Sequence, residues 1–195
     1  MGPYHAIMVH FPVALWIVAS GIVIYRACSD AAPARALDRV LPVLLLIGVL
    51  TGIVAYALGQ FVWSPAAVQK TPLGRNHMIG ATWTLACWAA VLYLRWRIGE
   101  PLWRTPLRRV VMATLGAVGG ILLAVTGTLG GHLHGAPAHL SDLLRLVGFD
   151  VYTTFYVPSW ALVVIAVAIV AMPVLAHAAT RATAARPVRA PEVAQ

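Results

Sequence analysis

Charged residues are scarce in this sequence. They make up 10% of its 195 residues, whereas soluble domains carry about 25%. Aspartate and glutamate together number only 6. Because 61% of the residues are hydrophobic and the mean hydropathy is +0.83, so few charges cannot cover a water-facing surface. The composition excludes an ordinary soluble domain and predicts a chain embedded in a membrane.

Cysteine is also rare, and several chemical signatures are missing. The two cysteines, Cys28 and Cys87, fall at the end of one apolar run and in the middle of another, so we expect no structural disulfide. No C-x-x-C-H motif occurs, so any haem is expected to be held non-covalently. The sequence has no nucleotide-binding loop and no paired carboxylates within an apolar run, which leaves hydrolysis and phosphoryl transfer without support. The net charge of +8 comes from basic residues between the apolar runs, so nucleic acid is not an expected partner.

The apolar runs reach the length needed to cross a bilayer, about 20 residues. They predict transmembrane helices at residues 5–26, 40–62, 77–97, 108–132 and 157–178, and a short interfacial helix within 143–155. We expect an all-α integral membrane bundle of about five transmembrane helices, a four-helix core plus one. This single transmembrane domain covers residues 1–180, and a disordered cytoplasmic tail follows at 181–195.

Basic residues are distributed unevenly between the two sides of this predicted bundle. Eleven arginines fall on the side of the C-terminal tail, and only Lys70, Arg75 and Arg145 fall on the other side. The positive-inside rule therefore places the N-terminus outside and the C-terminus in the cytoplasm. For a bacterial inner membrane, the outer side is the periplasm. Tryptophans at the ends of the predicted spans, Trp63, Trp96, Trp103 and Trp160, fit an aromatic belt.

A weak internal repeat accompanies this topology. His10 and His77 each open a predicted helix that ends at arginine, and each following helix contains Thr-Gly, at 51–52 and at 126–127. Thr and Gly are common in membrane helices, so the pattern is no more than an indication. The sequence predicts two repeated helical hairpins, with the fifth helix added outside them.

Six of the seven histidines gather on the predicted outer side: His5, His10, His77, His132, His134 and His139. Polar side chains at membrane depth are costly and are retained mainly where they line a pathway or bind something. Imidazole is a ligand for iron, copper and zinc, and helix bundles build cofactor sites from facing helices. We expect ligands among all of these except His139, which is interpreted as a loop residue, and we expect Arg75 to pair with a haem carboxylate. The alternative for each histidine is a structural role.

At these residues the sequence resembles a family of small bacterial membrane proteins, the domain of unknown function 2231. The matching stretches are YHAIMVHFPVAL, NHMIGATWTLACWAAVLYLRWR and TGTLGGHLHG, which together span roughly residues 4–135. The chain has Ala6 where the family usually has proline. The resemblance implies that His10, His77 and His132 are family positions, with His5 a fourth. It also implies a haem-binding electron-transfer protein.

The leading hypothesis is a membrane-bound, b-type cytochrome-like electron-transfer subunit with one or two haems b at the periplasmic side, and no catalysis of its own. His10 and His77 are the first predicted pair of axial ligands, while His132, His134 and His5 compete for another site. The first alternative is a periplasm-facing protein that binds copper or zinc with the help of Met8 or Met78, and the second is a structural subunit of a larger complex. The candidate partners are the lipid bilayer, a periplasmic cytochrome c or dehydrogenase subunit, and quinone.

Overall fold

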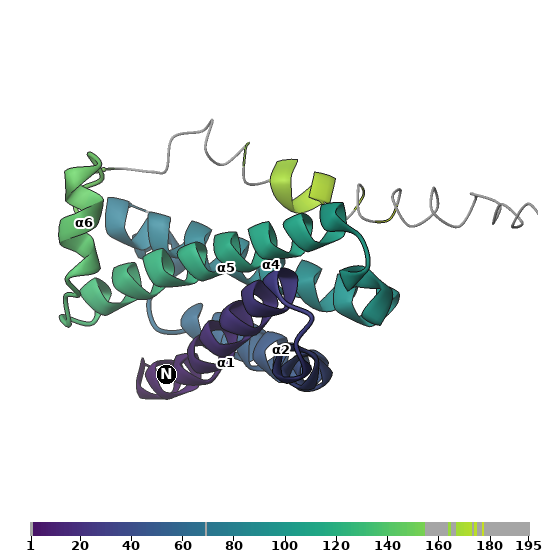
Figure 1. Ribbon diagram of the computed structural model, residues 1–195. Helices are drawn as coiled ribbons and strands as arrows, with labels where there is room; N and C mark the ends of the chain where they lie inside the picture. Colours follow the sequence, from purple (N-terminus) through teal and green to yellow (C-terminus); the bar gives the residue numbers. More distant parts are fainter. Residues whose placement is uncertain are drawn as a thin grey trace, which may run out of the picture.

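Four long helices form a bundle in the computed structural model, which describes residues 2–68 and 70–154 together with 164, 167–172, 174 and 177. They are α1 (Gly2–Cys28), α2 (Ala32–Gly59), α4 (Pro72–Ile98) and α5 (Pro106–Leu133) (Figure 1). Each has 27 or 28 residues and is apolar enough to span a membrane. At about 1.5 Å per residue they are about 40 Å long, which exceeds a hydrocarbon core of about 30 Å. The predicted all-α membrane bundle is confirmed, and the described residues contain no strand.

The parts of the chain after α5 are described only in part. The fifth predicted helix, 157–178, and the tail at 181–195 lie largely or wholly outside the described residues, although those described within 164–177 are helical. The interfacial helix expected within 143–155 starts and ends earlier than predicted, because α6 covers Leu140–Leu146 and is followed by turns. Two short elements were not predicted: α3 (Pro65–Val68) and the 3-10 helix η1 (Glu100–Trp103).

Helices α2, α4 and α5 begin at proline or Thr-Pro sequences, which a prediction from apolar length alone does not take into account. Thr71 caps α4 by accepting a hydrogen bond from the Gly74 backbone N–H at 3.1 Å, and Thr105 caps α5 in the same way. A proline follows each threonine at the first helical position, where its missing N–H costs nothing. Helix α2 begins at Ala32, well before the predicted residue 40, because Pro33 opens its first turn. The segment predicted as a loop there is largely helical.

The helices pack as two hairpins, α1–α2 and α4–α5, joined by contacts of α1 with α5 and of α2 with α4. At the centre the indoles of Trp16 and Trp88 stack, with ring centroids 5.9 Å apart and planes at 9°. A glycine of the neighbouring helix lies against each indole. A Cβ atom added at Gly48 would lie 2.6 Å from Trp16 Nε1, and one added at Gly119 would lie 2.9 Å from Trp88 Cε2. Only glycine permits this close approach, so these two positions fix the centre of the core.

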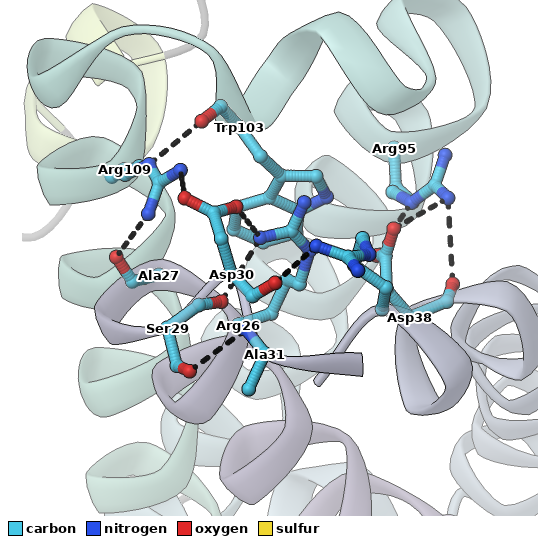
Figure 2. Close-up of polar contacts among 10 residues, drawn as sticks. Arg26, Ala27, Ser29, Asp30, Ala31, Asp38, Arg95, Trp103 and Arg109 are labelled. Atoms are coloured by element: carbon cyan, nitrogen blue, oxygen red, sulfur yellow. Dashed lines mark hydrogen bonds and ion pairs between the residues drawn. The ribbon is translucent and has the colours of Figure 1, made fainter. Parts of the chain in front are cut away.

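One end of the bundle, here called the arginine end, holds Arg26, Arg95 and Arg109 in ion pairs (Figure 2). Arg95 of α4 donates two hydrogen bonds of 2.9 Å to the Asp38 carboxylate of α2. Asp30 accepts hydrogen bonds from both Arg26 and Arg109. These bonds connect the two hairpins, because Asp30 lies between α1 and α2 whereas Arg109 belongs to α5.

Trp103 fills the same end and departs from its predicted place in an aromatic belt. Its side chain is 1% exposed, whereas Trp96 is 66% exposed. The Arg26 guanidinium lies 5.5 Å from the centroid of the Trp103 ring, and Arg109 donates to the Trp103 carbonyl at 2.7 Å. The short helix η1 turns this indole inward under the arginines. The arginine end is therefore closed by packed and paired side chains.

Candidate functional site

A cavity of about 470 Å³ lies at the opposite end of the bundle, where α1 begins and α5 ends. This end, which holds His5, His77 and His134, is called the histidine end here. All four long helices contribute to the cavity wall, and the wall is mostly apolar. Four histidines line it: His5, His10, His77 and His134. The volume lies within the range of about 300–1,000 Å³ that small-molecule and cofactor sites occupy.

His5 and His77 occupy equivalent positions in the two hairpins. His5 Nδ1 contacts the Ala55 carbonyl of α2 at 2.9 Å, and His77 Nδ1 contacts the Thr126 carbonyl of α5 at 3.1 Å. Each ring also lies on a glycine four residues further along the partner helix. A Cβ atom at Gly59 would be 3.1 Å from His5 Cε1, and one at Gly130 would be 3.0 Å from His77 Cε1.

The spacing of these residues reveals the register of the repeat. The same 72 residues separate His5 from His77 and Trp16 from Trp88. Gly48 and Gly59 are each 71 residues from their counterparts, Gly119 and Gly130. In the structure the equivalent of His77 is therefore His5, five residues before the His10 that the sequence pattern pairs with it.

His10 and His134 complete the set of imidazoles around the cavity. Their Nδ1 atoms bond to carbonyls one turn earlier in their own helices, His10 to Ala6 at 2.6 Å and His134 to Gly130 at 3.0 Å. The His134 ring lies 6.3 Å from that of His5, with planes at 22°. Both side chains are exposed at the rim, whereas those of His5 and His77 are partly buried.

The four histidines share one tautomer because of these bonds. A carbonyl oxygen only accepts, so each Nδ1 must carry the hydrogen, and each Nε2 is left with a lone pair. None of the four Nε2 atoms has a hydrogen-bond partner among the residues that the structure describes. An N–H bond from one ring nitrogen to a backbone carbonyl is the arrangement that orients metal-ligating histidines. The cavity thus presents several uncharged, oriented acceptors.

The comparisons with known proteins agree with this architecture. A family model described as predicted membrane protein (DUF2231) matches residues 1–136 of the chain. The chain belongs to this family. No curated protein and no solved structure matches the chain. The match covers the four long helices of this DUF2231 protein and ends at Ala136, which is a wall residue of the cavity.

The remaining predicted site residues of this DUF2231 protein lie outside the cavity wall. His132 is two residues before His134 but bonds through Nδ1 to the Tyr152 hydroxyl at 2.7 Å, and its buried Nε2 has no partner among the described residues. His139 is fully exposed and lies 3.6 Å from Asp142, as expected of a loop residue. Arg75 is exposed on the first turn of α4.

Several wall residues were not singled out from the sequence. Trp16 forms part of the cavity wall at its inner end, and Thr84 and Thr126 share a hydrogen bond of 3.2 Å beside it. On the α2–α4 side, Tyr56 and Thr82 share a hydrogen bond of 3.1 Å. The spacing of 72 residues, applied to Trp16 and Trp88, would have identified the central pair and the correct histidine register.

Metal sites made only of protein ligands find no support in this part of the DUF2231 chain. Within the described residues no group of three or more His, Cys, Asp or Glu side chains converges closely enough to hold a metal ion. Zinc sites take three or four protein ligands. Met78 does line a small side cavity of about 60 Å³ together with His5, His77 and His134, whereas Met8 lines neither cavity.

Proposed function

We propose that this protein is a membrane-bound, b-type cytochrome-like electron-transfer protein that holds a haem b in the cavity, with His5 and His77 as its protein ligands. The single observation that carries the proposal is that Nδ1 of each cavity histidine lies within hydrogen-bond distance of a backbone carbonyl, which leaves Nε2 of the neutral ring as an acceptor. Oriented Nε2 lone pairs at equivalent positions of two facing hairpins are what iron in a porphyrin requires of a protein. A bound haem supplies a one-electron couple between ferric and ferrous iron.

The chemistry of the donor set supports haem over the copper or zinc alternative. A porphyrin supplies four nitrogen ligands itself, so two imidazoles suffice, whereas the described residues hold no group of three or more side chains that could bind a bare metal ion. The apolar wall suits a large aromatic ring. Gly59 and Gly130 keep space beside His5 and His77, because a side chain at either glycine would press on the imidazole.

The chain's own residues would hold the ligand and exclude water from it. The Ala55 and Thr126 carbonyls fix the two imidazoles in orientation, and Trp16 limits the cavity toward the core. Arg75, two residues before His77, remains the predicted partner of a haem carboxylate at the rim. With the predicted topology, the histidine end faces the periplasm, where a cytochrome c or a dehydrogenase subunit would exchange electrons with it.

The test is a visible spectrum of the detergent-purified protein after haem-sufficient expression, with a pyridine haemochrome assay on the same sample. We expect a Soret band and a reduced α-band typical of bis-imidazole haem b. His5→Ala and His77→Ala are each expected to abolish the bis-imidazole spectrum, because each removes one ligand. His139→Ala is the matched control, since it removes an exposed histidine outside the cavity, and it should leave the spectrum unchanged.

The opposite results are equally informative. A folded wild-type protein without a Soret band would overturn the haem proposal, and metal analysis of that sample would then test for copper or zinc. A bis-imidazole spectrum that survives in both His5→Ala and His77→Ala would show haem binding but assign its ligands to other residues. His10→Ala and His134→Ala would then be the next variants to measure.

A further inference from the structure

The cavity has a lateral opening between the first half of α1 and the second half of α5. Helices α1 and α5 touch near the arginine end, where Ser20 donates to the Gly116 carbonyl at 2.9 Å and Val23 lies against Gly116. Toward the histidine end the cavity separates them, and its wall there is formed by Ala6, Val9 and Val13 of α1. Figure 1 shows the oblique crossing of α1 over α5, with the N-terminus directed away from α5.

His10 of α1 and Gly127 of α5 mark this opening. Both residues line the cavity, and both are exposed to solvent. A Cβ atom added at Gly127 would meet nothing within 4 Å, so open space lies in front of it. On the α2–α4 side the Tyr56–Thr82 hydrogen bond connects the helices instead. The cavity wall is therefore open beside His10 and Gly127.

The opening faces lipid rather than water. Because α1 and α5 are about 40 Å long, about 5 Å of each end lies outside a hydrocarbon core of about 30 Å. His10 is eight residues beyond Gly2, about 12 Å from the start of α1, and Gly127 lies about 9 Å before the end of α5 at Leu133. Both positions are within the hydrocarbon region. A molecule that enters here comes from the bilayer.

The chemistry at the opening defines the ligand. An exposed imidazole with a free Nε2 acceptor is costly at lipid depth unless a hydrogen-bond donor satisfies it. The described wall residues include no Asp, Glu, Lys or Arg, so a charged ligand would have no counter-charge. The ligand that fits is uncharged, donates a hydrogen bond from a flat head group and carries an apolar tail.

We propose that the opening between His10 and Gly127 docks the head group of a quinol that arrives from the bilayer, with a quinol hydroxyl donating to His10 Nε2. The tail stays in lipid, and the head group lies beside the cavity rather than in its depth. This inference deepens the proposed function, since a haem held in the cavity would lie beside the docked head group; it concerns binding and does not include the transfer of electrons. Quinone was a candidate partner from the sequence. The proposal assigns it a specific site and predicts that the reduced form, the quinol, binds there preferentially.

The experiment measures equilibrium binding of a short-tailed benzoquinol to the full chain in nanodiscs, by chromatography of the ligand retained after gel filtration. The quinol is added to dithionite-reduced protein and the quinone to oxidised protein, so that neither form changes during the measurement. We expect the quinol to bind more tightly than the quinone, because quinone carbonyls only accept and Nε2 in this tautomer has no hydrogen to donate.

Two variants test the docking site, and a third is the control. His10→Ala is expected to weaken quinol binding about fivefold, the effect of one hydrogen bond. Gly127→Leu is expected to abolish it by filling the opening, while His139→Ala should bind as the wild type does. Because His10 is exposed and its hydrogen bond among the described residues is to Ala6 of its own helix, His10→Ala should fold normally.

The haem spectrum of each sample separates the possible failures. Unchanged quinol binding in both His10→Ala and Gly127→Leu would overturn the docking site, and so would loss of the bis-imidazole spectrum in His10→Ala, which would make His10 an iron ligand. If the wild type binds no haem but loses quinol binding in His10→Ala, the docking site holds and the proposed function fails.

Discussion

The two ends of the bundle differ in how their polar side chains are paired. At the arginine end the charges are numerous and paired: Asp38 with Arg95, and Asp30 with Arg26 and Arg109. At the histidine end the polar groups are imidazoles that bond one ring nitrogen to a carbonyl and have no partner for the other among the described residues. At the arginine end the buried Arg26 Nε and Trp103 Nε1 also have no hydrogen-bond partner among the described residues, so the two ends differ in charge pairing rather than in complete satisfaction of their polar atoms.

This difference predicts that stability depends more on the middle and the arginine end of the bundle than on the histidine end. Ion pairs, Trp103 and the central Trp16–Trp88 stack hold the hairpins together from the middle to the arginine end. At the histidine end the helices are connected by fewer and uncharged hydrogen bonds, such as those of His5 with Ala55 and His77 with Thr126. Binding sites commonly keep polar groups unsatisfied, and the surrounding structure offsets that cost. Mutations at the two ends should accordingly have different consequences, which can be measured.

The largest expected effect on stability is at the buried ion pair of the arginine end. Asp38→Ala leaves the Arg95 guanidinium, 11% exposed, without its carboxylate, and should lower the free energy of unfolding by about 3–5 kcal/mol. His77→Ala should cost only about 1 kcal/mol, because it removes one hydrogen bond to Thr126. Thermal unfolding in detergent measures both.

The matched control for Asp38→Ala is Arg39→Ala, which removes an exposed charge from the next residue of α2 and should change stability by less than about 0.5 kcal/mol. If His77→Ala proved as destabilising as Asp38→Ala, the histidine end would be part of the structural core. The division between a stabilising end and a binding end would then be wrong.

A smaller effect locates the boundary between the filled and the open parts of the bundle. Gly48→Ala places a Cβ atom 2.6 Å from Trp16 Nε1 and should cost about 1–3 kcal/mol through overpacking. Gly127→Ala adds the same atom at the opening, where nothing lies within 4 Å, and should leave stability unchanged or raise it by up to about 1 kcal/mol. Equal effects at the two glycines would mean that the opening is closed in solution.

The sequence predicts the membrane spans but not which face of a helix each side chain occupies. Apolar length predicts the four long helices, although α2 begins at Ala32 rather than at residue 40, and the alternation of the spans places most of the histidines at one end. It does not reveal which way a side chain points. Two residues turn a helix by about 200°, so His134 lines the cavity while His132, from the same turn, contacts Tyr152 instead. Both residues are histidines, so residue type does not distinguish them; the packing of α5 on α4 and α6 does.

Trp103 and the repeat illustrate the same limit. A tryptophan at a span end is typical of an aromatic belt, yet the turn of η1 buries Trp103 beneath Arg26. The pairing of His10 with His77 was the simplest sequence alignment, because both open predicted helices. The structure pairs His77 with His5, since carbonyls and glycines of the partner helices, which leave little trace in hydropathy, position the rings.

The smallest expected effect is the pH dependence that Asp30 gives to the arginine end. Hydrogen bonds from Arg109 and Arg26 hold the pKa of the Asp30 carboxyl below its ordinary value of 3.8. Because the pKa is lower in the folded state, the contribution is fully present above the ordinary value and is lost as pH falls through the folded-state pKa. Asp30→Asn should therefore flatten part of the decline in melting temperature below about pH 4. Ser29→Ala is the control: it changes the same loop without removing a titrating group, so its melting temperature should fall with pH as that of the wild type does. If the melting temperature of Asp30→Asn fell as steeply as that of the wild type, carboxylates other than Asp30 would be responsible for the decline.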